Sequence, residues 1–155
     1  MYVETRMSWQ KLLDNGRVKR HRTSRQEIED LRAVVERDLQ DAGVREISAD
    51  RRFATAYNAV LQLTKMVIAC SGYRVSGIGH HQTTFEALEL AMGSKISDLV
   101  AYFDTCRRKR NQVDYDSAQV ASDTEVDELL AKAEEFRAMV EAWIKVHHPA
   151  YADNG

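Results

Sequence analysis

A run of four cations, Arg107, Arg108, Lys109 and Arg110, is the part of the sequence whose residue types suit a chemical task. That task is the binding of phosphate. An arginine guanidinium is planar, keeps its charge at any physiological pH and can donate to two phosphate oxygens at once. Which of these cations face a ligand depends on the element that carries them.

The run lies on a predicted helix, and two of its arginines fall where an apolar residue is expected. Apolar residues ahead of the run follow the spacing that marks the buried face of a helix: Ile96, Leu99, Val100 and Phe103. The same spacing continued from Phe103 reaches Arg107 and then Arg110. An unpaired buried cation is costly, so each arginine either pairs with a carboxylate or helps to hold an anion.

Local ion pairs are the structural alternative to an anion site. Asp114 lies four positions after Arg110, and Asp104 lies three positions before Arg107. Pairs at these separations stabilise a helix by roughly 0.2–0.5 kcal/mol each. Cations near the C-terminal end of a helix are also favourable. Spacing alone therefore leaves a salt-bridged helix end and an anion site equally open.

Serine caps, glycine stops and helical spacing predict the elements that position this run. The expected helices are 25–41 between Ser24 and Gly43, 49–70 between Ser48 and Gly72, 83–92 closed by Gly93, 95–112, and 123–148 after Ser122. Capping boxes are expected at 24–27, 83–86 and 122–125. Residues 72–82 are predicted to be a loop, and no segment shows strand alternation. The fold class is all-α, an up-and-down bundle of four to five helices.

One domain is expected, with short extensions at both ends. Residues 1–24 are predicted to be an N-terminal basic arm that can form a short helix over 8–13. Residues 25–148 form the bundle and 149–155 a C-terminal tail. The formal net charge of −2 provides no global field for nucleic acid, so contact with it must depend on local patches.

The remaining sequence features argue against metals, disulfides and membranes. Cys70 and Cys106 form no CxxC motif and are expected to be buried, reduced thiols. His80 and His81 are adjacent, which suits shared ligation of one metal poorly, so we expect them to pack against the bundle. No apolar run approaches the roughly 18 residues of a membrane span. We expect a cytoplasmic protein with no metal or other cofactor.

The helix order and several residues resemble the HEPN superfamily, an all-helical group named for nucleotide binding in higher eukaryotes and prokaryotes. The resemblance covers roughly residues 25–147. It is carried by the Tyr57-Asn58-Ala59-Val60 segment, by His80-His81 before a short helix, and chiefly by Arg107-x-x-Arg110-Asn111 followed by Tyr115. Many members are metal-independent ribonucleases, including toxins of toxin–antitoxin pairs, and typically join two motifs across a homodimer interface.

The resemblance implies roles for individual residues. Arg110 matches the motif arginine and Asn111 the polar residue after it, so Arg107, Arg110 and Asn111 are the expected phosphate- and RNA-binding residues. The motif histidine falls five to seven positions after the arginine, and Tyr115 stands at the first of these positions. Arg110 and Tyr115 are therefore the candidate catalytic residues, and a homodimer, an RNA or nucleotide ligand and a separately encoded protein partner are expected.

The tyrosine at position 115 bears on whether the protein binds RNA or also cleaves it. Metal-free RNA cleavage needs a base for the ribose 2′-hydroxyl, which histidine provides near neutral pH. Tyrosine has a reference pKa of about 10 and is a poor base, although its hydroxyl can position a phosphate. We therefore expect RNA or nucleotide binding first and, if the chain is an enzyme, a metal-independent endoribonuclease. The alternative is a non-catalytic helical module for dimerisation or partner binding.

Overall fold

The computed structural model describes residues 7–77, 80–115 and 119–154, and for Asp114 and Tyr115 the backbone alone. The fold is all-α, as predicted. Its helices are α1 (Trp9–Asp14), α2 (Arg25–Ala42), α3 (Ala49–Cys70), α4 (His80–Met92), α5 (Ser97–Tyr115) and α6 (Asp123–His147). The other described elements are strands β1 (Val18–Arg20) and β2 (Tyr73–Val75) and the 3-10 turns η1 (Ser94–Ile96) and η2 (Pro149–Tyr151).

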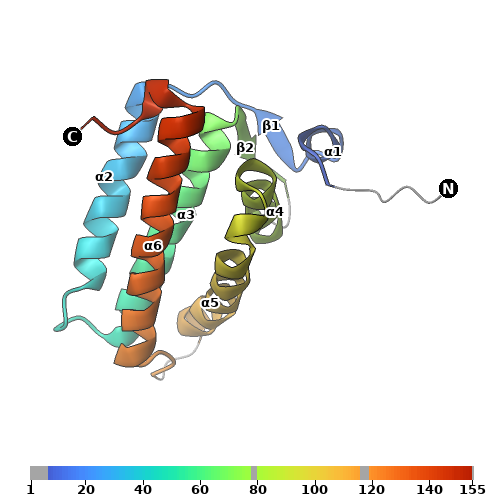
Figure 1. The fold of residues 1–155 in the computed structure, drawn as a ribbon. Coiled ribbons are helices and arrows are strands. Elements are labelled where there is room, and N and C mark those ends of the chain that lie inside the picture. Colours follow the sequence, from blue (N-terminus) through green and yellow to red (C-terminus); the bar gives the residue numbers. More distant parts are fainter. Residues whose placement is uncertain (1–6, 78–79, 116–118, 155) are drawn as a thin grey trace.

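Helix α3 is the centre of the bundle. Figure 1 shows α2, α3 and α6 side by side, with α4 and α5 beside α3 on the side away from α2. Apolar residues cover most of the α3 surface, as expected of a helix surrounded by others. Its largest buried side chains include Phe53, Tyr57, Leu63 and Met66. No described helix combines the length and the apolarity that a membrane crossing requires.

The predicted serine caps are present, but only one of the capping boxes is complete. The Ser122 hydroxyl accepts from the Glu125 amide, and the Glu125 carboxylate accepts from the Ser122 amide. Ser24 caps α2 in the same way, yet Glu27 does not return the bond. Its carboxylate instead accepts from the Thr23 hydroxyl at 2.6 Å and lies 2.7 Å from His21 Nε2. The capping box predicted at 24–27 is therefore wrong in its second half.

The prediction of a loop over 72–82 is wrong at residues 73–75 and 80–82. Residues 73–75 form β2, and α4 begins at His80, ahead of the capping box predicted at 83–86. Thr83 and Thr84 lie inside the helix, where the Thr84 hydroxyl donates to the His80 carbonyl at 2.6 Å. The strand was not predictable from local pattern because its hydrogen-bonding partner, β1, lies far away in sequence.

The N-terminal residues pack onto the bundle. The fully buried side chains of Leu12 and Val18 form a second apolar cluster with Ile68 of α3 and Ala87 of α4. Strand β1 pairs antiparallel with β2. The segment that we expected to be a basic arm is thus, from residue 8 onward, part of the folded body. Through β1 this segment also holds β2, the strand that precedes α4 in the chain.

Candidate functional site

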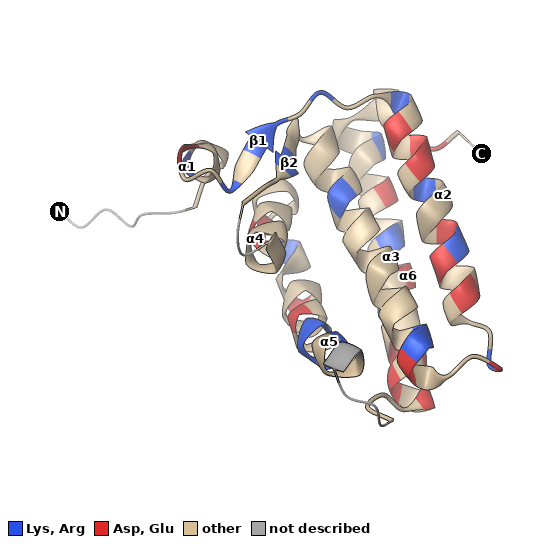
Figure 2. Ribbon diagram, turned by 180° about the vertical axis from the view of Figure 1, so that it is seen from behind, with Lys and Arg blue, Asp and Glu red and all other residues tan. Residues whose placement is uncertain are grey.

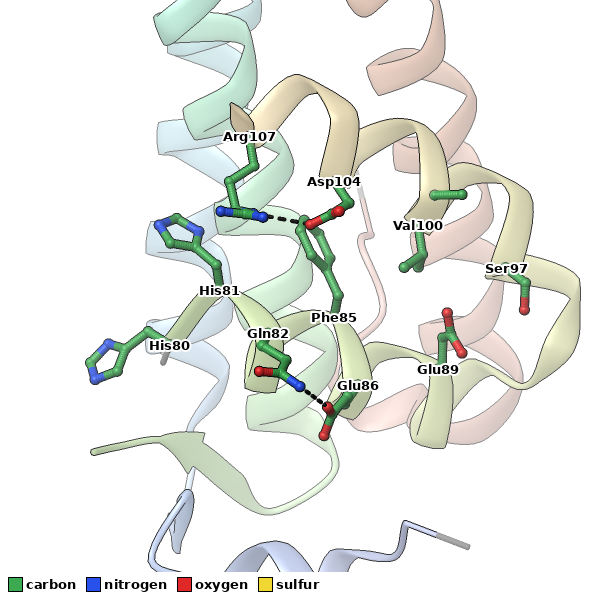
Figure 3. Close-up of a pocket in the computed structure, with 11 residues that line it drawn as sticks. His80, His81, Gln82, Phe85, Glu86, Glu89, Ser97, Val100, Asp104 and Arg107 are labelled. Atoms are coloured by element: carbon green, nitrogen blue, oxygen red, sulfur yellow. Dashed lines mark hydrogen bonds and ion pairs between the residues drawn. The ribbon is translucent and has the colours of Figure 1, made fainter. Parts of the chain in front are cut away.

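A cavity of about 780 Å³ lies between α4 and α5 (Figure 3). Phe85 and Val100, one from each helix, contribute apolar surface to it. His81 and Arg107 lie at one end, and Glu86 and Glu89 lie toward the other. The cavity therefore offers a cationic end, an apolar surface and an acidic end.

Arg107 is the sequence-predicted residue that lines this cavity. Its Nε donates to Asp104 Oδ1 at 3.0 Å, which confirms the predicted ion pair. The same carboxylate accepts from Arg108 Nη2 at 3.1 Å, so one negative charge serves two guanidiniums. The expectation that Arg107 interrupts the buried stripe is wrong, since Cys106 is 4% exposed and continues it while the Arg107 side chain is 27% exposed. Arg107 stands at the cavity edge with a surplus of positive charge beside it.

Arg110 and Asn111 lie one turn further along α5 and are half-buried. Among the described residues neither lines the cavity, but Arg110 is near enough to influence the pKa values of Tyr57 and His81. Lys109 turns toward α6, where its Nζ lies 2.6 Å from Glu125 Oε2. The cationic run thus divides between the cavity side and the α6 side of the helix.

Helix α5 begins later and ends later than the predicted 95–112. The turn η1 occupies residues 94–96, and the helix continues through Tyr115 without unwinding after Asn111. On a continuous helix the fifth residue after Arg110 lies about 140° around the axis. The Arg110 and Tyr115 positions therefore point in different directions within one protomer. The side chains of Tyr115 and Asp114 lie outside the described residues, so their roles remain predictions.

His81 is the residue that the sequence analysis did not select. It lies in the first turn of α4, is half-buried, and faces the Arg107 guanidinium in Figure 3. Burial lowers the pKa of His81, and the positive charges of Arg107, Arg110 and His80 lower it further. A neutral imidazole at pH 7 follows from this environment. The sequence spacing of His81 and Arg107 did not predict that they lie close together, because their proximity depends on how α4 packs against α5.

Tyr57 of α3 does not line the cavity but lies next to its cationic end. The residue is fully buried, and its hydroxyl has no hydrogen-bond partner among the described residues. Burial raises the pKa of Tyr57, while Arg107 and Arg110 oppose that rise. Its ring centroid lies 6.4 Å from that of His81. The Tyr57 hydroxyl is thus a buried donor without a described partner, beside two arginines and a histidine. An anionic oxygen is an acceptor that would satisfy it.

At the acidic end, Glu86 has polar partners within the protein. Glu86 lies 3.4 Å from Arg17 Nη1 and accepts from Gln82 Nε2 at 3.0 Å, whereas Glu89 is exposed. Oxygen acceptors at this end suit the amino groups of a ligand whose anionic group occupies the other end. The cavity thus favours a ligand that carries both kinds of group.

The described part of the chain contains no group of three or more His, Cys, Asp or Glu side chains that could hold a metal ion. Cys70 and Cys106 are free and buried, and burial raises the pKa of each thiol to about 11. Both are therefore protonated packing residues.

The chain matches no model of a known protein family, no curated protein and no solved structure. The resemblance to the HEPN superfamily consequently rests on the residues that carry it.

Proposed function

We propose that this chain is a HEPN-like RNA-binding protein that holds a phosphate group of RNA at the cationic end of the cavity between α4 and α5. The proposal rests on one observation. Arg107 and His81 lie together at one end of the cavity, and Tyr57, whose ring lies beside that of His81, has a buried hydroxyl without a described partner. A phosphate oxygen at this point accepts from the guanidinium and from the tyrosine hydroxyl.

The whole cavity suits a nucleotide unit of such an RNA. With the phosphate at Arg107, the base extends over Phe85 and Val100 toward the carboxylates of Glu86 and Glu89. Exocyclic amino groups of bases are hydrogen-bond donors, and carboxylates accept from them. An inorganic anion alone would leave the apolar surface and the acidic end unused.

A second candidate activity at the same site is metal-independent cleavage of the bound RNA, and the position of His81 favours it. The imidazole lies at the site with its pKa lowered, so it is in the form that accepts a proton. In such a reaction the ribose 2′-oxygen attacks phosphorus as its proton passes to His81. The 5′-oxygen of the next nucleotide leaves and takes a proton from water. Arg107 stabilises the charge on the phosphate oxygens.

Assembly belongs to the proposal as well. By the resemblance, a homodimer would bring Tyr115 of one protomer toward Arg110 of the other, and a toxin-related protein would have a separately encoded partner. The alternative is a non-catalytic helical module for dimerisation or partner binding. The large apolar side chains exposed in the described residues are Met7, Val44, Ile47 and Val146, from three separate segments, so a dimer of either kind would need polar contacts as well.

The proposal is tested by measuring the binding of a single-stranded RNA by fluorescence anisotropy in a buffer that contains EDTA. The variants to compare are Arg107→Ala and its matched control, Arg108→Ala. Both arginines share Asp104, but Arg108 is 71% exposed and lies outside the cavity lining. Loss of a charge-assisted hydrogen bond of about 1.5–3 kcal/mol predicts roughly 10- to 100-fold weaker binding for Arg107→Ala. Arg108→Ala should change the affinity by less than about threefold. Equal effects of the two substitutions would refute the phosphate site.

Cleavage is examined in the same buffer by the size of the RNA on a denaturing gel. The wild type should produce fragments, and both His81→Gln and Arg107→Ala should abolish them. Intact RNA with the wild type, at concentrations that saturate binding, would restrict the function to binding.

A further inference from the structure

A second cavity, of about 470 Å³, opens between α3, β2 and the start of α4. His80 and His81 line it as well as the first cavity, so the two cavities meet at these histidines. The second cavity also contains two cations, Lys65 of α3 and Arg74 of β2. The two cavities therefore lie on either side of His80 and His81, with Lys65 and Arg74 in one and Arg107 in the other.

The carboxylate in this second cavity is already engaged. Glu27 accepts from the Thr23 hydroxyl and lies against His21. These bonds lower the pKa of Glu27, the bond from Thr23 most strongly, and the charge of Lys65 lowers it slightly. One carboxylate shared by His21, Thr23 and Lys65 leaves Arg74 uncompensated, and the cavity keeps a positive surplus.

Strand β2, which lines the second cavity, pairs with β1 in a two-stranded ribbon that brings like charges opposite each other. In the β1–β2 register Lys19 lies directly opposite Arg74, and both side chains are exposed. Neither forms an ion pair with any residue that the structure describes. Like charges at directly opposed positions destabilise a strand pair, so this pairing costs stability that an anion on the ribbon would restore.

Aromatic packing holds the ribbon in place. Tyr73 of β2 stacks on Trp9 of α1, with ring centroids 4.3 Å apart and an angle of 3° between the planes. The Arg20 guanidinium lies 6.0 Å from the centre of the Tyr73 ring. The cations of the ribbon therefore stand on a fixed surface and not on a mobile arm. Figure 2 shows basic segments on β1, β2 and the C-terminal half of α5, all on the side away from α2.

We infer that the ligand of the phosphate site is a single strand of RNA that continues from Arg107, past His80 and His81, onto a second binding surface formed by Lys19, Arg74 and Lys65. This inference rests on the proposed function and extends it from one phosphate site to a second surface that holds the continuing strand. A flexible single strand can follow two cavities that meet at a corner. A basic groove that tracks the backbone is the usual means of binding such a strand.

The test compares two ligands, a mononucleotide and a single-stranded RNA of about 12 nucleotides. The ribbon variant is Lys19→Gln/Arg74→Gln. Its control, Arg51→Gln/Lys145→Gln, removes the same charge from two exposed cations that line neither cavity. Because the ribbon variant removes a repulsive pair, its melting temperature should equal or exceed that of the wild type, which separates loss of binding from loss of folding.

Binding of the 12-nucleotide RNA should weaken about tenfold in the ribbon variant. The slope of log affinity against log salt should fall by about 1.4, since each phosphate contact with a single strand contributes about 0.7. Mononucleotide affinity should stay at the wild-type value, and the control variant should match the wild type with both ligands.

The outcomes separate this inference from the function on which it rests. If the ribbon variant binds the RNA like its control while Arg107→Ala weakens binding, the second surface is refuted and the phosphate site stands. If the ribbon variant weakens RNA binding while Arg107→Ala behaves like Arg108→Ala, the phosphate site is refuted and with it the continuous path. RNA binding that neither variant changes refutes both.

Discussion

Tyr57 and His81, from helices α3 and α4, face each other with ring centroids 6.4 Å apart and planes inclined at 39°. Nothing in the described part of the chain accepts from the Tyr57 hydroxyl, although the residue is fully buried. The two arginines that influence Tyr57 also influence His81. Three helices thus bring a donor, a neutral imidazole and two cations to one point.

Replacement of Tyr57 by phenylalanine should stabilise the free protein and weaken RNA binding. A buried hydroxyl without a partner costs about 1–3 kcal/mol, so its removal should raise the free energy of unfolding by about 1 kcal/mol. If that hydroxyl donates to phosphate, RNA affinity should fall at the same time. Urea unfolding and anisotropy measure the two effects.

The control for this substitution is Tyr102→Phe on α5. The hydroxyl of Tyr102 interacts with the Cys106 thiol, so its removal should not stabilise the protein. If Tyr57→Phe lowers the free energy of unfolding by more than about 1 kcal/mol, the hydroxyl has a partner in the free protein, which would contradict its role as an available donor to phosphate.

The pH dependence of RNA binding should report on His81. Burial and neighbouring cations hold its pKa below the usual value of about 6.5, so the unfolded chain binds a proton there more readily than the folded one. Stability should therefore decrease as the pH falls through about 6.5 toward the lower folded pKa. Bound phosphate favours the protonated ring, so RNA affinity should increase over the same fall in pH.

Titration of the His81 ring by NMR, with and without RNA, measures this coupling directly. The resolved ring signal is needed because burial also lowers the pKa of His148, which adds to the loss of stability. A His81 pKa that RNA leaves unchanged would place the phosphate elsewhere. In His81→Gln the increase of affinity at low pH should disappear.

Removal of the Arg52 side chain should lower the free energy of unfolding more than removal of an exposed cation. The Arg52 side chain is 0% exposed, with Nε donating to the Ala42 carbonyl at 2.8 Å and Nη1 to Asp123 at 3.0 Å. It therefore joins the end of α2 to the start of α6. We expect Arg52→Ala to lower the free energy of unfolding by about 3 kcal/mol. Neighbouring Arg51→Ala, at an exposed position, should change it by less than about 0.5 kcal/mol in the same urea experiment.

Both cysteines should resist alkylation in the folded protein. With pKa values of about 11 and burial within the core, Cys70 and Cys106 present very little accessible thiolate at pH 8. Iodoacetamide should modify neither thiol in buffer and both in concentrated urea, as mass spectrometry would show. Rapid modification of Cys106 in buffer would mean that the α5 stripe is open to solvent.

Local sequence signals predicted the parts of this fold that depend on neighbours along the chain. Ser48 and Gly72 bound α3 as expected, and Ser122 with Glu125 begins α6 as expected. The Arg107–Asp104 pair was likewise predictable, since it spans one helical turn. The β1–β2 pair was missed, because its stabilising hydrogen bonds join residues more than fifty positions apart.

The sequence by itself therefore determined the helical class, most helix ends and a cationic run on α5, because spacing and capping are local properties. Tertiary structure alone decided that Cys106, and not Arg107, continues the buried stripe. It also placed His81 at the Arg107 end of the cavity and the Tyr57 ring beside that of His81. The reason is physical: the packing of α3, α4 and α5 sets which side chains meet, and no spacing along one helix encodes how three helices are placed.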